Sequence, residues 1–299
     1  MTRRATALIL ATLCLCAAAF AGDKKKDPNE IGDRNVSKGL NFYSLEQELA
    51  LGKQLAIEVQ RQTKIIDDTI LSEYINRLGQ NLARNSDVTF PVSFQLIDSD
   101  EINAFTLPGG YVFINSALVE LSGNEAELAS ALAHEVGHVA ARHATRQASR
   151  DRLMNIGALP IAVLGGPLAH LGTNAMMPLA SMKFSREFES EADLLGIQYL
   201  WKAGYDPNAS VDLFEALAST EKRQPGSVAK LFRAHPLTPD RIEKTQKNIE
   251  KLLPARAEYV LNSSEYEDMR TRLERLMKKP AEEDFKTPTL RRDAASQWE

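Results

Sequence analysis

The sequence has almost no cysteine. Its two cysteines, Cys14 and Cys16, both lie in an apolar run near the start of the chain, shortly after Arg3 and Arg4. A basic start, a short apolar centre and small residues up to Ala21 are typical of a secretory signal peptide, so we expect cleavage after Ala21. The mature chain would then have neither a disulfide nor a thiolate ligand, and any metal ion must be held by nitrogen and oxygen.

Two membrane anchors are alternatives for this leader. The apolar run is about 16 residues long, whereas a helix that spans a bilayer needs roughly 20. Leu13 and Leu15 precede the cysteines, where a lipid-modified bacterial protein would have small residues. We therefore favour export with cleavage, and we expect a periplasmic protein if the cell is Gram-negative.

The chain also lacks an excess of positive charge. Of its 299 residues, 36 are Lys or Arg and 40 are Asp or Glu, which gives a net charge of −4. A nucleic-acid-binding protein presents a basic face, so we expect no nucleic-acid partner. The apolar fraction of 43% is ordinary for a globular protein and can form the core of one large or two small domains.

Histidine is scarce, and two of the five histidines belong to one motif. His134 and His138 form the pattern H-E-x-x-H inside a run of helix-forming residues, and residues four apart on a helix can bind one metal ion together. Glu135 lies beside them, where a carboxylate can take a proton from a metal-bound water without binding the metal. The motif predicts a zinc hydrolase and favours a peptidase; a surface helix with these residues by chance is the alternative.

The metal-binding helix should begin after the N-cap Asn124 and continue to about Arg150. On such a continuous helix His143 lies about 140° from His138 and falls on the apolar stripe. We therefore interpret His143 as a core or helix-end histidine and not as a ligand.

A second predicted helix, over residues 185–204, contains three glutamates. At about 100° per residue, Glu187 and Glu191 share a face with the polar residues Gln198 and Lys202. We expect this face to be exposed to water.

Glu189 and Asp193 share a mostly apolar face of the same helix. An inward carboxylate needs a cation or hydrogen-bond donors to offset its desolvation, and a zinc ion between two histidines would supply the cation. We predict that Glu189 is the third metal ligand, and that Asp193 fixes the tautomer of a ligand histidine. Three protein ligands leave one position for water, as in catalytic sites, and we expect one Zn²⁺ per chain.

The remaining pattern predicts an α+β, mainly α domain with a small β-sheet next to the metal-binding helix. Helices are expected from Ser44 and over 68–83, residues 92–98 alternate as a strand, and 103–115 has the pattern strand, Pro-Gly-Gly turn, strand. An extended peptide can add to the edge of such a hairpin, although a purely structural hairpin is the alternative. The candidate substrate-binding residues are Asn103, Ala104, Phe105, Gly109 and Gly110.

Composition divides the chain into segments. We expect a signal peptide over 1–21, a flexible linker with solvated lysines over 22–41, the metallopeptidase domain over 42–279 and a disordered tail over 280–299. The apolar segment 157–182 contains too many Pro and Gly residues for a spanning helix. We interpret it as a mobile lid that could make a peripheral membrane contact, and a buried loop-helix segment is the alternative.

Together these motifs resemble one family. The H-E-x-x-H pattern, the E-x-x-x-D of Glu189 to Asp193, Asn103-Ala-Phe with Pro108-Gly-Gly, and Ala234-His235-Pro236 ahead of Asp240-Arg241 are similar to the zinc metallopeptidases related to HtpX, the CAAX prenyl endopeptidases and BepA. The similarity extends over about residues 42–276. It implies a gluzincin-type domain, zinc, and endopeptidase activity on unfolded or misassembled protein.

The resemblance also implies that His235 comes near the metal, where it stabilises the oxyanion or occupies zinc in a latent state. From its own context, His235 before a proline is a loop histidine. HtpX-like members have membrane helices that we do not find in the mature chain. BepA carries a C-terminal helical-repeat module for which no repeat is visible, so the sequence does not support docking to the outer-membrane assembly machinery.

The sequence thus predicts an exported zinc metalloendopeptidase that acts on protein or peptide substrates in envelope quality control. In this mechanism Glu135 is the general base and His235 is the second catalytic group. One alternative is a chaperone-like binding module with a structural zinc. Another is a zinc hydrolase that acts on an ester or a cell-wall amide.

Overall fold

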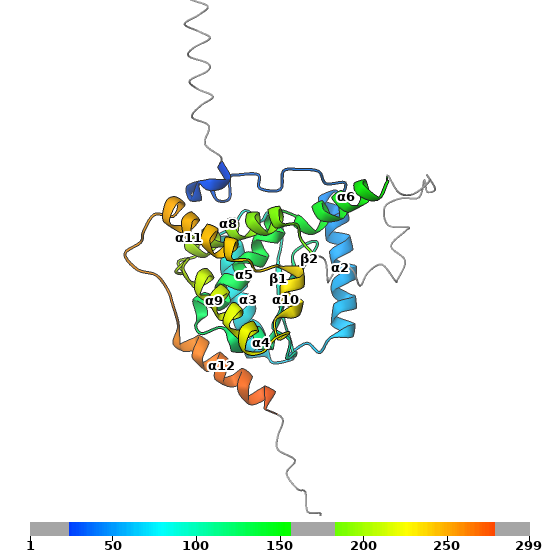
Figure 1. Cartoon of the computed structure of the whole chain (residues 1–299). Coiled ribbons are helices and arrows are strands. Elements are labelled where there is room, and N and C mark those ends of the chain that lie inside the picture. The colour runs from blue at the N-terminus through cyan, green and yellow to red at the C-terminus, as the bar shows by residue number, and fades with distance from the viewer. Residues whose placement is uncertain (1–23, 157–182, 279–299) are drawn as a thin grey trace, which may run out of the picture.

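The computed structural model describes residues 24–156 and 183–278, in which helices surround a small sheet (Figure 1). The predictions for 1–21, 157–182 and 280–299 lie outside these residues. The predicted fold class, α+β and mainly α, was confirmed. The elements are η1 Lys24–Lys26, η2 Pro28–Glu30, α2 Leu45–Gln62, α3 Thr69–Arg84, β1 Ser93–Ile97, β2 Ala104–Leu107, β3 Tyr111–Asn115, α4 Ser116–Leu121, α5 Glu125–Ala140, α6 His143–Ile156, α8 Arg186–Lys202, α9 Ala209–Arg223, α10 Ala229–Ala234, α11 Pro239–Leu252 and α12 Ser264–Met277.

The sheet has the strand order β1-β3-β2, with β1 parallel and β2 antiparallel to β3. The predicted hairpin is formed by β2 and β3, with Ala104 opposite Ile114. Gly109 and Gly110 have φ angles of 74° and 85°, in the left-handed region that favours glycine, and they make the turn. Strand β2 is therefore one of the two edge strands beside β3, and it packs against α5.

The metal-binding helix α5 begins where it was predicted to begin. Asn124 Oδ1 accepts a hydrogen bond from the backbone N–H of Glu127 at 3.0 Å, and the Glu127 carboxylate accepts from the backbone N–H of Gly123 at 2.8 Å. The first contact satisfies an N–H group that the first turn of a helix leaves unpaired, and the second fixes the residue before the cap.

The predicted continuation of this helix to about Arg150 was wrong. Helix α5 ends at Ala140, and the separate helix α6 begins at His143. Between them Arg142 has a φ of 55°, which is a costly conformation for a residue other than glycine. Arg142 Nε donates to Glu48 Oε2 at 2.6 Å and its Nη2 donates to the backbone oxygen of Tyr43 at 2.9 Å, and these contacts hold the turn in place.

Helices α5 and α8 approach each other closely at two glycines. A Cβ atom on Gly137 would lie 2.9 Å from the backbone oxygen of Ala192, and one on Gly196 would lie 3.2 Å from the Cα of His134. A side chain at Gly137 would push the helices apart, and a side chain at Gly196 would require the backbone of His134 to shift by a few tenths of an ångström. This close approach brings one face of α8 against the H-E-x-x-H residues.

The burial of α8 agrees only in part with the angular prediction. Glu189 and Asp193 are buried, with 1% and 8% of their surface exposed, and Glu187 is exposed, as predicted. The prediction of a wet face was wrong for Gln198, which is 0% exposed, and for Glu191, whose side chain is 14% exposed. The N-terminal segment covers both residues.

That segment, residues 24–41, was expected to be a flexible linker with solvated lysines, but it packs along the body of the protein (blue in Figure 1). Lys25 forms an ion pair with Glu191, so this lysine is not simply solvated. Arg34 Nε donates to Asp87 Oδ2 at 2.9 Å, and the hydroxyl of Tyr199 donates to the same oxygen at 2.7 Å. Residues 24–41 are therefore part of the folded domain.

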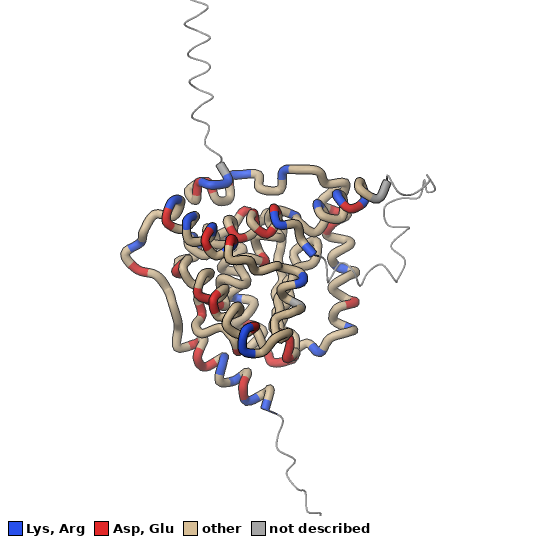
Figure 2. Tube along the Cα trace, viewed as in Figure 1, with Lys and Arg blue, Asp and Glu red and all other residues tan. Residues whose placement is uncertain are grey.

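The C-terminal half adds helices α9 to α12: α9 packs on α5, α11 packs on α8, and α12 packs on α3 and α4. A loop after α9 leads to the short helix α10, which was not predicted. Acidic and basic residues are interspersed along α11 and α12 (Figure 2). None of the helices described in residues 24–156 and 183–278 combines the length and the apolar character needed to cross a bilayer.

Candidate metal centre and active site

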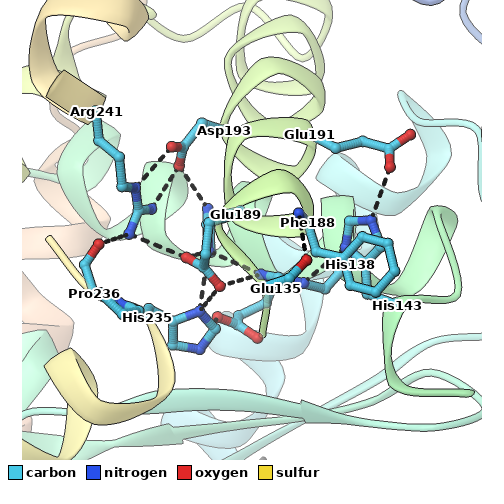
Figure 3. A network of polar contacts seen from close by, with 12 residues as sticks. Glu135, His138, His143, Phe188, Glu189, Glu191, Asp193, His235, Pro236 and Arg241 are labelled. Carbon is cyan, nitrogen blue, oxygen red and sulfur yellow. Dashed lines mark hydrogen bonds and ion pairs between the residues drawn. The ribbon is translucent and has the colours of Figure 1, made fainter. Parts of the chain in front are cut away.

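Four potential ligand side chains converge at one point of the fold. His134 and His138 come from α5, Glu189 comes from α8, and His235 directly follows α10. One ligand-type atom of each residue lies within 4.8 Å of the other three. Figure 3 shows Glu189 between His138 and His235. The structure thus brings together the histidines and the glutamate singled out from the sequence, while Glu187 stays exposed.

The spacing of these atoms fits a zinc ion. His134 Nε2 lies 3.0 Å from His138 Nε2 and 3.6 Å from Glu189 Oε2, and His138 Nε2 lies 3.5 Å from Glu189 Oε1. In a tetrahedral zinc site with bonds of about 2.0–2.2 Å, the ligand atoms lie about 3.3–3.6 Å apart. Both distances from a histidine nitrogen to a Glu189 oxygen match this range, and the two histidine nitrogens lie slightly closer together. Two imidazole nitrogens and a carboxylate oxygen are also donors that zinc accepts readily. The residues present therefore fit the metal that the motif implies.

His235 is a fourth donor and also touches the candidate general base. Its Nδ1 lies 3.0 Å from Glu189 Oε1 and 3.3 Å from His134 Nε2, and its Nε2 lies 3.6 Å from Glu135 Oε1. Burial alone would lower the pKa of His235, but the charges of Glu189 and Glu135 raise it. His235 is therefore placed to hold a proton between these two carboxylates.

Glu135 is buried beside the ligand group without belonging to it. It is 2% exposed, and its Oε2 has no hydrogen-bond partner among the described residues. Burial raises the pKa of its carboxyl group, which makes the carboxylate a better proton acceptor. An unpaired oxygen on a buried carboxylate next to a metal-binding group is the arrangement that a general base requires.

Asp193 and Arg241 contact the side chains of the metal-binding group without belonging to it. Asp193 Oδ1 lies 3.0 Å from His134 Nδ1, and Arg241 makes a two-pronged contact with the Asp193 carboxylate at 2.8 and 2.7 Å. Burial alone would raise the pKa of Asp193, but Arg241 and His134 lower it. Arg241 Nη1 also lies 3.0 Å from Glu189 Oε2. The guanidinium thus offsets the charge of two buried carboxylates.

His143 lies outside the ligand group, as predicted, and it is fully buried. The prediction missed its contact with His138, because it assumed one continuous helix. His143 Nδ1 lies 2.9 Å from His138 Nδ1, and His143 Nε2 lies 3.1 Å from Glu191 Oε2. Burial lowers the pKa of His143 to about 3, so its ring is neutral in the folded protein near pH 7.

The candidate substrate-binding residues are not all at one place. Ala104 lines a pocket together with His134 and Glu135. Gly109 and Gly110 lie instead against α2 and the residues just before β1, and the pocket lining does not include them. Phe105 stacks on Phe113 at a ring distance of 5.3 Å and packs with α2. Asn103 is buried, and its backbone oxygen accepts from Asn115 N at 3.0 Å.

The pocket beside Glu135 is mostly apolar. It opens between α5, α8, α9 and the α10 segment. Its polar lining residues include His134, Glu135 and His235. Its large apolar lining residues are Leu118, Ile197, Leu213, Phe214, Leu217, Leu231, Phe232 and Leu237.

A sequence model of peptidase family M48 matches residues 70–249, which include all four candidate metal ligands. The chain belongs to peptidase family M48. The predicted resemblance to the HtpX and BepA-like metallopeptidases was therefore confirmed.

The M48 chain has curated relatives in bacteria and fungi. It is 34% identical to the beta-barrel assembly-enhancing protease of Escherichia coli (strain K12) over 272 residues, which are 87% of this chain and 54% of that protein. It is 34% identical to the mitochondrial metalloendopeptidase OMA1 of Saccharomyces cerevisiae over 156 residues, 51% of this chain and 44% of OMA1. It is 27% identical to the metalloprotease YcaL of Escherichia coli (strain K12) over 226 residues, 72% of this chain and 86% of YcaL. The chain thus spans about half the length of the beta-barrel assembly-enhancing protease.

Proposed function

We propose that this M48 chain is an exported, zinc-dependent endopeptidase that cleaves unfolded or misassembled proteins of the bacterial envelope. The observation that carries the proposal is the convergence of His134, His138 and Glu189, with the carboxylate of Glu135 beside them and outside the ligand group. A site that only stabilises the fold has no need for this additional buried carboxylate. The periplasm is the proposed location, in keeping with the predicted signal peptide.

In the proposed site, the side chains of His134, His138 and Glu189 hold the metal. A bound zinc ion would lower the pKa of a water ligand towards about 7 and polarise the carbonyl of the substrate. Asp193 and Arg241 keep the ring of His134 and the carboxylate of Glu189 in position.

Glu135 and His235 carry out the proton and charge chemistry. Glu135 takes a proton from the attacking water, because its Oε2 is unpaired and its raised pKa favours proton uptake. It then returns the proton to the leaving amine. His235, held between Glu135 and Glu189, donates from its ring to the oxygen of the scissile carbonyl as negative charge develops there.

The shape of the site favours an extended polypeptide as the substrate. Edge strand β2 packs against α5 and can add a peptide strand through its backbone, and Ala104 on β2 lines the pocket. The apolar lining of the pocket would accept a large apolar side chain next to the scissile bond. Such side chains are buried in folded proteins and accessible in unfolded ones, which agrees with a role in quality control.

The test is casein digestion by the mature protein. We expect digestion to stop when a chelator removes the metal and to return when zinc is added. Glu135→Gln should keep bound zinc and lose hydrolysis, whereas Glu187→Gln, on the exposed face of α8, should change neither. Turnover by Glu135→Gln, or digestion that is insensitive to the chelator, would refute the proposal.

A further inference from the structure

The turn between α5 and α6 brings His143 into contact with His138. On a continuous helix, residues five apart point about 140° away from each other and do not meet. Because Arg142 adopts a positive φ, α6 leaves in a new direction, and His143 Nδ1 comes within 2.9 Å of His138 Nδ1. The two rings meet nearly edge to face, at 73°. The nitrogen of His138 that faces His143 is the one outside the metal-binding group.

The other nitrogen of His143 faces a carboxylate. His143 Nε2 lies 3.1 Å from Glu191 Oε2, and Arg146 Nη1 lies 3.2 Å from the same oxygen. Lys25 of the N-terminal segment pairs with the second oxygen of Glu191. Figure 3 shows His143 between His138 and Glu191. His138, His143 and Glu191 thus form a line of contacts that starts at the metal-binding group and ends at a half-buried carboxylate held by two cations.

The ring of His143 is fixed in this orientation by its neighbours. Its side chain is 0% exposed, and it stacks on Phe188 at a ring distance of 4.3 Å and an angle of 19°. Phe188 in turn lies under the guanidinium groups of Arg146 and Arg150. This packing holds the His143 ring in one orientation, so its two nitrogens point in fixed directions.

The carboxylate of Glu191 determines which ring nitrogens of His143 and His138 carry a hydrogen. An ionised carboxylate can only accept, so Glu191 requires the hydrogen of His143 to be on Nε2. Arg146 and Lys25 already balance the charge of Glu191, so His143 can stay neutral and its Nδ1 is a bare acceptor. His138 must then carry its hydrogen on Nδ1. Its Nε2 is left with a free lone pair that faces His134 and Glu189.

We propose that His143 is a positioning residue for the metal site: it accepts the Nδ1 hydrogen of His138, donates its own Nε2 hydrogen to Glu191, and so keeps His138 Nε2 ready to bind metal. The inference rests on the proposed function only in taking His138 as a metal ligand. Helix α8 then orients both histidines of α5, because Asp193 faces His134 directly and Glu191 faces His138 through His143. Contacts of this kind typically change metal affinity by about 10–100-fold.

The test compares two replacements of His143 in the otherwise intact chain. His143→Phe fills the same space but has no acceptor for His138, whereas the amide oxygen of His143→Asn takes the place of Nδ1. Zinc affinity is measured by competition with a chromophoric chelator, and thermal unfolding of each metal-free protein is recorded beside it.

We expect His143→Phe to bind zinc about 10–100-fold more weakly than the wild type, and His143→Asn to recover most of that loss. Equal affinity for wild type and His143→Phe would overturn the inference. So would a lower melting temperature of the metal-free variant with an unchanged zinc affinity, because that result indicates a packing role alone.

A second readout needs no substitution. Imidazole ¹⁵N chemical shifts of the wild type should show that His138 carries its hydrogen on Nδ1 both with and without zinc. A hydrogen on Nε2 of His138 in the metal-free protein would overturn the inference. This measurement decides the question even if His143→Phe does not fold. If the wild type binds no zinc, the proposed function fails, and the tautomer of His138 in the metal-free protein still decides the role of His143.

Discussion

Removing the side chain of Arg34 should strongly destabilise the protein, although Arg34 is far from the active site in sequence. Arg34 and Asp87 form an ion pair whose side chains are 1% and 0% exposed. Asp87 also accepts hydrogen bonds from the backbone N–H of Gly32 at 2.8 Å and from the hydroxyl of Tyr199. Arg34→Ala would remove the cation and leave the carboxylate of Asp87 buried.

The size of the effect follows from this burial. Breaking a buried ion pair from one side costs about 3–5 kcal/mol, because the remaining charge is uncompensated. Arg34 Nη1 also donates to the backbone oxygens of Lys25 and Asp27 at 2.7 and 3.1 Å, so these anchors of the N-terminal segment are lost as well. In a domain of this size, each kcal/mol lowers the melting temperature by about 2–4 °C. We therefore expect a decrease of roughly 6–20 °C.

The assay is thermal unfolding together with urea titration of the mature protein. Lys64→Ala is the matched control, since it breaks the pair of Lys64 with Asp98, in which the lysine side chain is 80% exposed. Exposed pairs contribute only about 0–1 kcal/mol, so the control should unfold near the wild-type temperature. If Arg34→Ala unfolds together with this control, residues 24–41 are not an integral part of the domain and the reasoning is refuted.

Three further substitutions test the site. Asp193→Asn keeps an acceptor near His134 but removes the charge that Arg241 balances, so zinc affinity should fall by about 10-fold or more; an unchanged affinity in chelator competition would contradict this role. Gly137→Ala places a Cβ 2.9 Å from the backbone oxygen of Ala192, and we expect a loss of about 1–3 kcal/mol in urea titration; equal or greater stability would show that α5 and α8 can move apart freely. Phe214→Ala enlarges the pocket beside Glu135 and should shift cleavage of a peptide library towards bulkier side chains next to the scissile bond; an unaltered profile would exclude the pocket from substrate binding.

Periodicity predicted the parts of the fold that depend on local sequence. The helices expected after Ser44, Asn124 and Ser185 begin there. Each of these short polar side chains accepts a hydrogen bond from a backbone N–H of the first helical turn. The predicted inward direction of Glu189 and Asp193 also agrees with their burial, because α8 is a regular helix.

The features that were missed depend on contacts between distant segments. No glycine or proline marks the end of α5 in the sequence. The left-handed conformation of Arg142 is instead stabilised by contacts with Glu48 and the Tyr43 backbone, which lie about 100 residues earlier in the chain. The burial of Glu191 and Gln198 depends on the segment around Lys25, and helical periodicity does not show what will cover a polar face. The contact of His143 with His138 follows from the same unpredicted turn.

The most direct measurement is anomalous scattering at the zinc absorption edge from crystals of the zinc-loaded mature protein. The structure predicts one peak, at about 2.0–2.2 Å from His134 Nε2, His138 Nε2 and a Glu189 oxygen, with the Glu135 carboxylate outside bonding distance. A peak bound by Glu135 or by Glu187 in place of Glu189, or no peak between the two histidines, would contradict the proposed catalytic centre.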